Sequence, residues 1–95
     1  MAVNVEDAAD PQWVPQGVAA GRVRYRREVS GLDRIMAYVE FERWEDESPT
    51  SYHWSVQDGS CGKVLDQGWV DAEQGGLDGA FAAADAAVAR LFPGH

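Results

Sequence analysis

Apolar and polar side chains alternate along two neighbouring segments of the chain, residues 22–29 and 34–44. An alternation with a period of two residues is typical of strands that bury one face and expose the other. Between the two segments, residues 30–33 read Ser-Gly-Leu-Asp, which is turn chemistry. We therefore predict a β-hairpin with one apolar face and one face rich in arginine and glutamate.

The same pattern predicts the register of this hairpin. When the numbers of paired residues sum to 64, apolar residues meet apolar residues on one face and opposite charges meet on the other. A slip of one residue would mix the two faces. The predicted pairs are Arg22 with Glu42, Val23 with Phe41, Arg24 with Glu40, Tyr25 with Val39 and Val29 with Ile35.

Two more strands are predicted in residues 50–57 and 63–70, joined by a turn at residues 58–62, Asp-Gly-Ser-Cys-Gly. In the first of them, apolar side chains again alternate with polar ones. In the second, the alternation predicts Leu65 and Trp69 on the apolar face. It predicts Val64, Asp66 and Gly68 on the opposite face.

The period changes near the C-terminus, where large apolar residues recur at intervals of four, three, four and three. This spacing is one stripe of an α-helix. Asp78 lies near its start, Arg90 lies near its end, and residues 93–94, Pro-Gly, terminate it. Many alanines allow this helix to approach the sheet closely. The predicted stripe consists of Leu77, Phe81, Ala84, Val88 and Leu91.

These elements predict an α+β fold: a four-stranded antiparallel meander packed on one C-terminal α-helix (ββββα). A length of 95 residues fits a single domain, which we place at residues 21–95. Residues 1–20 combine acids, prolines and small residues without sustained periodicity, so we expect a flexible or loosely docked N-terminal arm. Trp13 is the residue by which this arm is able to fold back onto the domain.

Acids outnumber bases by 16 to 8, for a formal net charge of −8. Such a charge disfavours association with nucleic-acid phosphates or anionic lipids, so we expect neither nucleic acid nor membrane as a partner. The chain has no apolar run long enough to span a bilayer. Its N-terminus is acidic, whereas the start of a signal peptide is basic. Together with the richness in alanine and arginine, this predicts a bacterial, cytoplasmic protein.

Residues that could carry chemistry form no convincing constellation. Cys61 is the single cysteine, which excludes an intrachain disulfide. We expect His53, Ser55 and Asp66 to share one sheet face, but neighbours two apart on a strand are about 6.5–7 Å apart, too far for a catalytic triad. No metal-binding spacing of histidine or cysteine is present. We therefore predict no catalytic residue, no cofactor and no metal site.

The face of the sheet opposite the helix, called here the helix-free face, is the most informative surface. Arginine, tyrosine, tryptophan and methionine on an exposed face are the composition of protein interfaces. The alternative is that these side chains simply cover a small sheet, with arginine stems lying over aromatic rings. The predicted contact residues are Arg24, Arg26, Met36, Tyr38, Trp44 and His53.

We therefore expect a non-enzymatic protein–protein interaction module that binds a protein partner or a second copy of itself. Two alternatives remain. The acidic chain has the charge of a nucleic-acid-mimicking inhibitor of a basic protein. Conversely, five arginines in residues 21–34 permit weak nucleic-acid binding by the first hairpin, although the predicted pairing with Glu40 and Glu42 cancels much of that charge.

Overall fold

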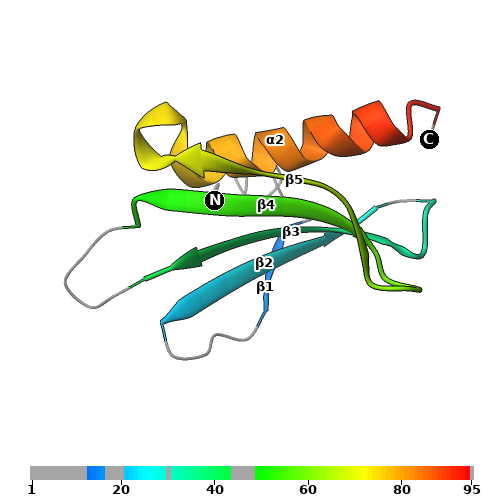
Figure 1. Cartoon of the computed structure of the whole chain (residues 1–95), viewed down its shortest axis with the longest axis horizontal. Helices are drawn as coiled ribbons and strands as arrows, with labels where there is room; N and C mark the ends of the chain where they lie inside the picture. The colour runs from blue at the N-terminus through cyan, green and yellow to red at the C-terminus, as the bar shows by residue number, and fades with distance from the viewer. Residues whose placement is uncertain (1–12, 17–20, 30, 44–48, 95) are drawn as a thin grey trace, which may run out of the picture.

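In the residues that the computed structural model describes (13–16, 21–29, 31–43 and 49–94), five antiparallel strands form one sheet in the order β1-β2-β3-β4-β5, with a C-terminal helix beside it (Figure 1). The predicted α+β architecture is confirmed, with five strands rather than four. The elements are β1 (Val14–Pro15), β2 (Arg22–Glu28), β3 (Ile35–Glu42), β4 (Ser51–Asp58), β5 (Lys63–Asp71), the 3-10 turn η1 (Ala72–Gln74) and α2 (Gly76–Leu91).

The hairpin of β2 and β3 has the predicted register. Val23 lies opposite Phe41, and Arg24 lies opposite Glu40. The predicted pairs of Arg22 with Glu42 and of Tyr25 with Val39 are also present. At the turn, the Val29 N–H donates to the Ile35 carbonyl at 3.4 Å. The pattern was sufficient because a one-residue slip would have placed the apolar side chains of one strand on the same face as the charged side chains of the other.

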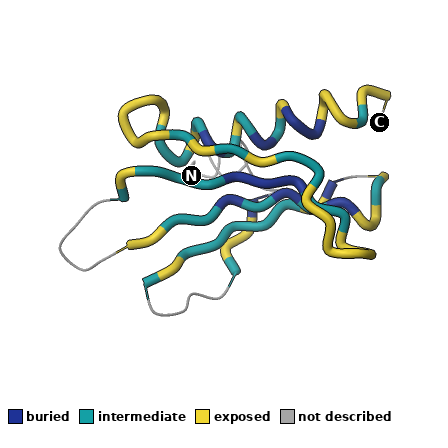
Figure 2. Tube along the Cα trace, viewed as in Figure 1, coloured by how far each residue is buried: buried dark blue, intermediate teal, exposed yellow. Residues whose placement is uncertain are grey.

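The core lies between α2 and the face of the sheet that carries Val39 and Val56, both fully buried. The helix packs on β3, β4 and β5, and the buried residues of α2 form a line along one side of it (Figure 2). The helix meets the sheet mainly through small side chains, which permits close packing. These residues are Ala80, Ala84, Ala87 and Val88.

The predicted helix stripe is correct at its centre and wrong at its end. Ala84 and Val88 are buried, and Leu77 and Phe81 are half-buried. Leu91, however, is 38% exposed, and Phe92 just after the helix packs against the core instead. Among the described residues, no helix is both long and apolar enough to cross a membrane.

The fifth strand comes from the segment that the sequence assigned to the N-terminal arm. Val14 pairs with Arg26 and Pro15 with Tyr25, which makes β1 an edge strand. Trp13 is 6% exposed and stacks on Phe81, with ring centroids 4.6 Å apart. Phe81 in turn meets Tyr25 edge to face at 5.3 Å. A two-residue strand containing a proline has no detectable periodicity, so the sequence pattern missed it.

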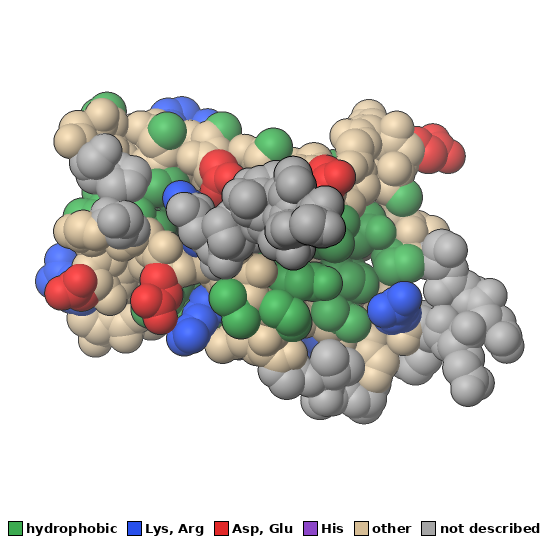
Figure 3. All heavy atoms as spheres, turned by 180° about the vertical axis from the view of Figure 1, so that it is seen from behind, with side chains coloured by type: hydrophobic (Ala, Val, Ile, Leu, Met, Phe, Trp, Pro, Cys, Tyr) green, Lys and Arg blue, Asp and Glu red, His purple; other side chains and the backbone are tan. Residues whose placement is uncertain are grey.

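Hydrophobic side chains gather on the side of the molecule seen from behind (Figure 3). On the helix-bearing face of the sheet, aromatic rings extend the core beyond the helix itself. The Phe41 ring lies 4.9 Å from the Tyr52 ring and 6.4 Å from the Tyr25 ring, measured between centroids. All three side chains are half-buried. Trp13 and Phe81 therefore belong to a continuous aromatic cluster rather than to an isolated contact.

A register shift in the pairing of β4 and β5 changes which side chains β5 presents. Val56 pairs with Asp66 and Gln57 with Val64, so Leu65 is an extra residue in β5. Beyond this bulge, Gly68 lies opposite Trp54 and Trp69 lies opposite His53. The prediction that Trp69 lies on the apolar face is therefore wrong, as is the prediction that Asp66 and Gly68 lie on the helix-free face. Leu65 does pack against the core, as predicted.

Candidate interaction surface on the helix-free sheet face

The structure places five of the six predicted contact residues on the helix-free face. They come from three adjacent strands, β2, β3 and β4. Arg26 lies opposite Tyr38, and Met36 lies opposite Glu28. The sixth residue, Trp44, lies outside the described residues. Those brought together are Arg24, Arg26, Met36, Tyr38 and His53.

The arginines on this face are each paired with a carboxylate. Arg24 Nε lies 2.7 Å from Glu40 Oε2, and the Arg24 guanidinium carbon lies 4.2 Å from the centroid of the Tyr38 ring. Arg26 lies 3.5 Å from Glu28. Exposed pairs of this kind are each worth about 0–1 kcal/mol. They stabilise little, but they neutralise the basic charge of β2 and fix the Arg24 side chain over the Tyr38 ring.

Among the described residues, Trp69 is the most exposed large hydrophobic one on this face, and the sequence pattern missed it. Its side chain is 69% exposed. The His53 ring lies beside it, with centroids 4.8 Å apart and planes tilted by 53°. His53 Nε2 also lies 3.0 Å from Gln67 Oε1. The signal that the sequence does contain is a glycine inside a strand, which often marks a bulge or a close approach of another group. Here Gly68 leaves room for the buried Trp54 ring, and Trp69 lies on the other face.

The close fit of Gly68 and Trp54 is visible in the geometry. A Cβ atom on Gly68 would lie 2.8–2.9 Å from atoms of the Trp54 ring, closer than side chains pack. The two residues therefore determine each other's position. Successive side chains of a strand point to opposite faces, so the contact between Gly68 and Trp54 on the helix-bearing face also places Trp69 on the helix-free face.

Ser55 lies on the same face, yet it is only 3% exposed. Its hydroxyl oxygen accepts a hydrogen bond from Gln57 Nε2 at 3.1 Å. Asp66, which the sequence placed beside Ser55 and His53, instead pairs with Val56 on the helix-bearing face. The three residues therefore do not converge. Within the described part of the chain, no three His, Cys, Asp or Glu side chains are close enough to hold a metal ion, and Cys61 is exposed.

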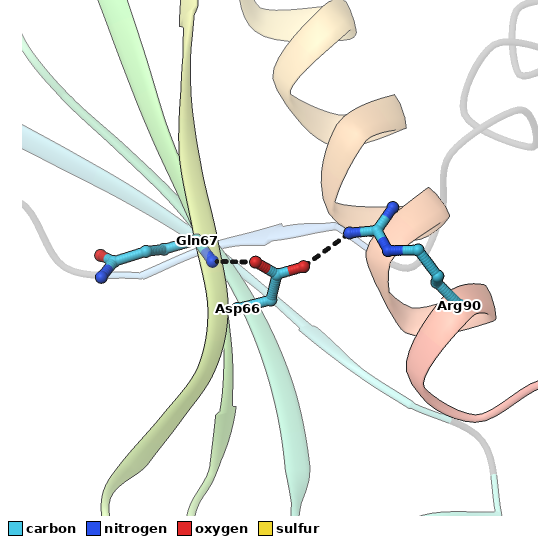
Figure 4. A network of polar contacts seen from close by, with 3 residues as sticks. All are labelled: Asp66, Gln67 and Arg90. Atoms are coloured by element: carbon cyan, nitrogen blue, oxygen red, sulfur yellow. Dashed lines mark hydrogen bonds and ion pairs between the residues drawn. The ribbon is translucent and has the colours of Figure 1, made fainter.

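Asp66 joins β5 to the end of the helix (Figure 4). Its Oδ1 accepts a hydrogen bond from the backbone N–H of Gln67 at 2.9 Å. Its Oδ2 accepts one from Arg90 Nη2 at 2.5 Å. One carboxylate thus bridges an edge-strand donor and a helix side chain.

A partly buried ion pair lies on the opposite side of the sheet, under the helix. Arg27 Nη1 is 3.3 Å from Asp85 Oδ1. Burial raises the pKa of Asp85, while the Arg27 charge and the nearby Trp13 indole lower it in part. This pair joins α2 to β2. It lies away from the helix-free face and forms no part of the candidate surface.

No protein-family model, no curated protein and no solved structure matches this chain. The geometry of the helix-free face and the charge of the chain are therefore the observations from which a function is argued.

Proposed function

We propose that this chain is a non-enzymatic protein–protein interaction module that binds a protein partner through its helix-free face. The single observation that carries the proposal is the exposure of Trp69 at 69% beside His53, on a face that also holds Tyr38 and Arg24. No described element covers this face.

The energetic argument rests on the residue types and their state. A tryptophan exposes roughly 150–250 Å² of surface, and burial contributes about 25 cal/mol per Å². Covering the exposed part of Trp69 therefore contributes about 3–4 kcal/mol of hydrophobic free energy, from which the costs of association are subtracted. Tyr38 is held by the Arg24 guanidinium, so little side-chain freedom is lost on binding. A pre-ordered aromatic group next to an arginine has the character of an interface hot spot.

The proposal is tested by comparing partners captured from a cell lysate by the wild-type protein, by Trp69→Ala and by Tyr38→Ala. We expect one partner to be retained by the wild type and lost by both variants. Leu91→Ala is the matched control, because Leu91 is also an exposed large hydrophobic residue but lies at the end of the helix. Circular dichroism checks that all four proteins are folded. Equal capture by wild type and by both surface variants contradicts the proposal.

A second candidate function, inhibition of a basic protein by nucleic-acid mimicry, is favoured by the net charge of −8. It is distinguished by competition: a mimic is displaced from its partner by double-stranded DNA, whereas a partner bound through Trp69 is not. Weak nucleic-acid binding by the first hairpin is disfavoured by the ion pairs of Arg22, Arg24 and Arg26 with glutamates.

A further inference from the structure

Strand β5 forms one edge of the sheet, so half of its backbone hydrogen-bonding groups point away from β4. The phase of the ladder identifies these groups. Just after β5, the Ala72 N–H donates a hydrogen bond to the carbonyl of Thr50, the residue just before β4. Because groups alternate along an antiparallel strand, Gly68 and Val70 also point toward β4, whereas Gln67, Trp69 and Asp71 point outward.

The outward groups differ along the edge. The Gln67 N–H is occupied, because the Asp66 carboxylate accepts from it and is itself held by Arg90 (Figure 4). The N–H and C=O groups of Trp69 and the N–H of Asp71 have no such bond within the described part of the chain. The edge is therefore closed by a side chain at Gln67 and open from Trp69 to Asp71.

We propose that the open edge of β5 receives an extended, basic segment of a partner protein as an additional antiparallel or parallel strand. The proposal rests on the proposed interaction function and names the class of partner. Main-chain hydrogen bonds to Trp69 and Asp71 supply the pairing. The Asp66–Arg90 bridge limits the pairing at Gln67, where no free donor is left.

Charge selects the occupant. Asp71 lies on this edge, and Glu73 and Asp78 follow it in the chain; all three are exposed, and none of them forms an ion pair with another described residue. Arginine or lysine side chains on the added strand would reach these carboxylates. An arginine would also stack on the exposed Trp69 ring. A second copy of the chain is disfavoured as the occupant, because each copy carries a net charge of −8.

The probe is a capped peptide of about eight residues in which Thr and Arg alternate. Two matched peptides separate the contributions. One replaces Arg by Glu, which reverses the charge. The other keeps the sequence but is N-methylated at alternate residues, which removes backbone donors and keeps every charge. Binding is measured by calorimetry and by backbone amide shifts in NMR spectra.

We expect the Thr-Arg peptide to bind with a dissociation constant below about 1 mM and to shift the amides of Trp69 and Asp71 most. The Thr-Glu peptide should not bind, and N-methylation should weaken binding at least about tenfold. No binding of the Thr-Arg peptide, or equal binding after N-methylation, overturns the proposal. A salt-sensitive interaction that N-methylation leaves unchanged is charge attraction alone.

Asp71→Pro and Asp71→Asn form a matched pair of variants. Asp71 has φ −77°, which proline adopts without strain, and its N–H points outward, so proline removes no bond to β4. Asp71→Asn loses the same charge but keeps the N–H. We expect proline to weaken peptide binding more than asparagine does, with the same urea midpoint for both proteins. Equal weakening overturns strand addition.

The remaining outcomes separate this inference from the proposed function. If the partner captured by the wild-type protein is lost by Tyr38→Ala but retained by Asp71→Pro, the module function stands and the edge proposal fails. If ultracentrifugation shows a dimer that Asp71→Pro abolishes, the occupant is a second copy and the basic partner strand is overturned.

Discussion

Gly68 shows how one residue without a side chain fixes the position of two tryptophans. A Cβ atom at this position would meet the Trp54 ring at 2.8–2.9 Å. We predict that Gly68→Ala lowers the free energy of unfolding by about 1–3 kcal/mol, because the buried Trp54 ring must move. Urea unfolding measures this loss. Gly94→Ala is the control, since a Cβ there meets nothing within 4 Å; equal stability of the two variants contradicts the argument.

Asp58 organises the turn between β4 and β5. Its Oδ1 accepts hydrogen bonds from the Ser60 hydroxyl at 2.7 Å and from the Ser60 N–H at 3.0 Å. These bonds, the hydroxyl first, lower the pKa of Asp58 below its ordinary value of 3.8. The carboxylate therefore adds stability above pH 3.8, and that stability is lost as pH falls through the lower folded-state pKa.

We predict that Asp58→Asn is less stable than the wild-type protein at neutral pH and equally stable in strong acid. Asparagine keeps an acceptor for Ser60 but has no charge, so the difference isolates the ionic part of the turn. Unfolding free energies measured across a pH series give the two curves. When Ser60→Ala removes the hydroxyl donor from both proteins, the difference in unfolding free energy between Asp and Asn at position 58 should become smaller. Parallel curves over the whole series would contradict the assignment.

At the scale of elements, the two-residue strand β1 is held in place either by its backbone hydrogen bonds to β2 or by the packing of the Trp13 side chain. Trp13 is 6% exposed against Phe81, whereas the neighbouring Val14 is 50% exposed. We predict that Trp13→Ala costs about 3 kcal/mol and Val14→Ala less than about 1 kcal/mol. Chemical unfolding measures both. Similar losses in the two variants would show that β1 is held by its backbone pairing instead.

The register of β2 with β3 could be predicted because two independent patterns, apolar pairs and opposite charges, agree in it. The faces of β5 could not be predicted by alternation, because the extra residue Leu65 reverses the alternation partway along the strand. This bulge displaced Trp69 from the predicted apolar face to the helix-free face. The most exposed residue of the candidate surface was consequently missed, although Tyr38 and His53 lie where the pattern placed them.

The packing of the helix could also be predicted only in part. Period and composition predicted α2, but not which residues of its stripe the sheet reaches. Three alanines, which carry little weight in a hydrophobic pattern, are buried together with Val88, whereas Leu91 is exposed. Gly75, just before α2, and Gly76, its first residue, have positive φ, 122° and 59° respectively. They lie where the chain turns from β5 and η1 into α2, and glycine adopts positive φ there without steric cost.

At the scale of the whole molecule, the sheet carries its helix on one face, and no described element covers the other. A lone helix cannot cover five strands, so Trp13 and the aromatic cluster complete the cover on one side. On the other face, paired charges and aromatic rings take its place. Asp71, Glu73 and Asp78, which form no ion pair with another described residue, lie at the end of β5, in η1 and in the first turn of α2, which gives the chain an acidic edge shortly after Trp69.

Two electrostatic effects of opposite sign decide how salt changes stability. The net charge of −8 causes self-repulsion in the folded state, which salt screens. Salt also weakens the ion pairs of β2 and β3, but pairs such as Arg22–Glu42, with side chains 59% and 60% exposed, contribute little. The repulsion should therefore dominate.

We predict that raising NaCl from a few millimolar to about 0.2 M increases the free energy of unfolding by about 0.5 kcal/mol, or about 2–4 °C in Tm. Scanning calorimetry measures the shift, and a plateau near that concentration distinguishes screening from a general salting effect.

Ala82→Lys and Ala82→Gln, at an exposed helix position, are the matched variants. The lysine, which also lies one turn from Asp78, should be the more stable at low salt and lose its advantage at high salt. A fall in Tm with added salt would mean that the local ion pairs outweigh the net charge, and the acidic edge would then be a less effective attractor of a basic strand than its charge implies.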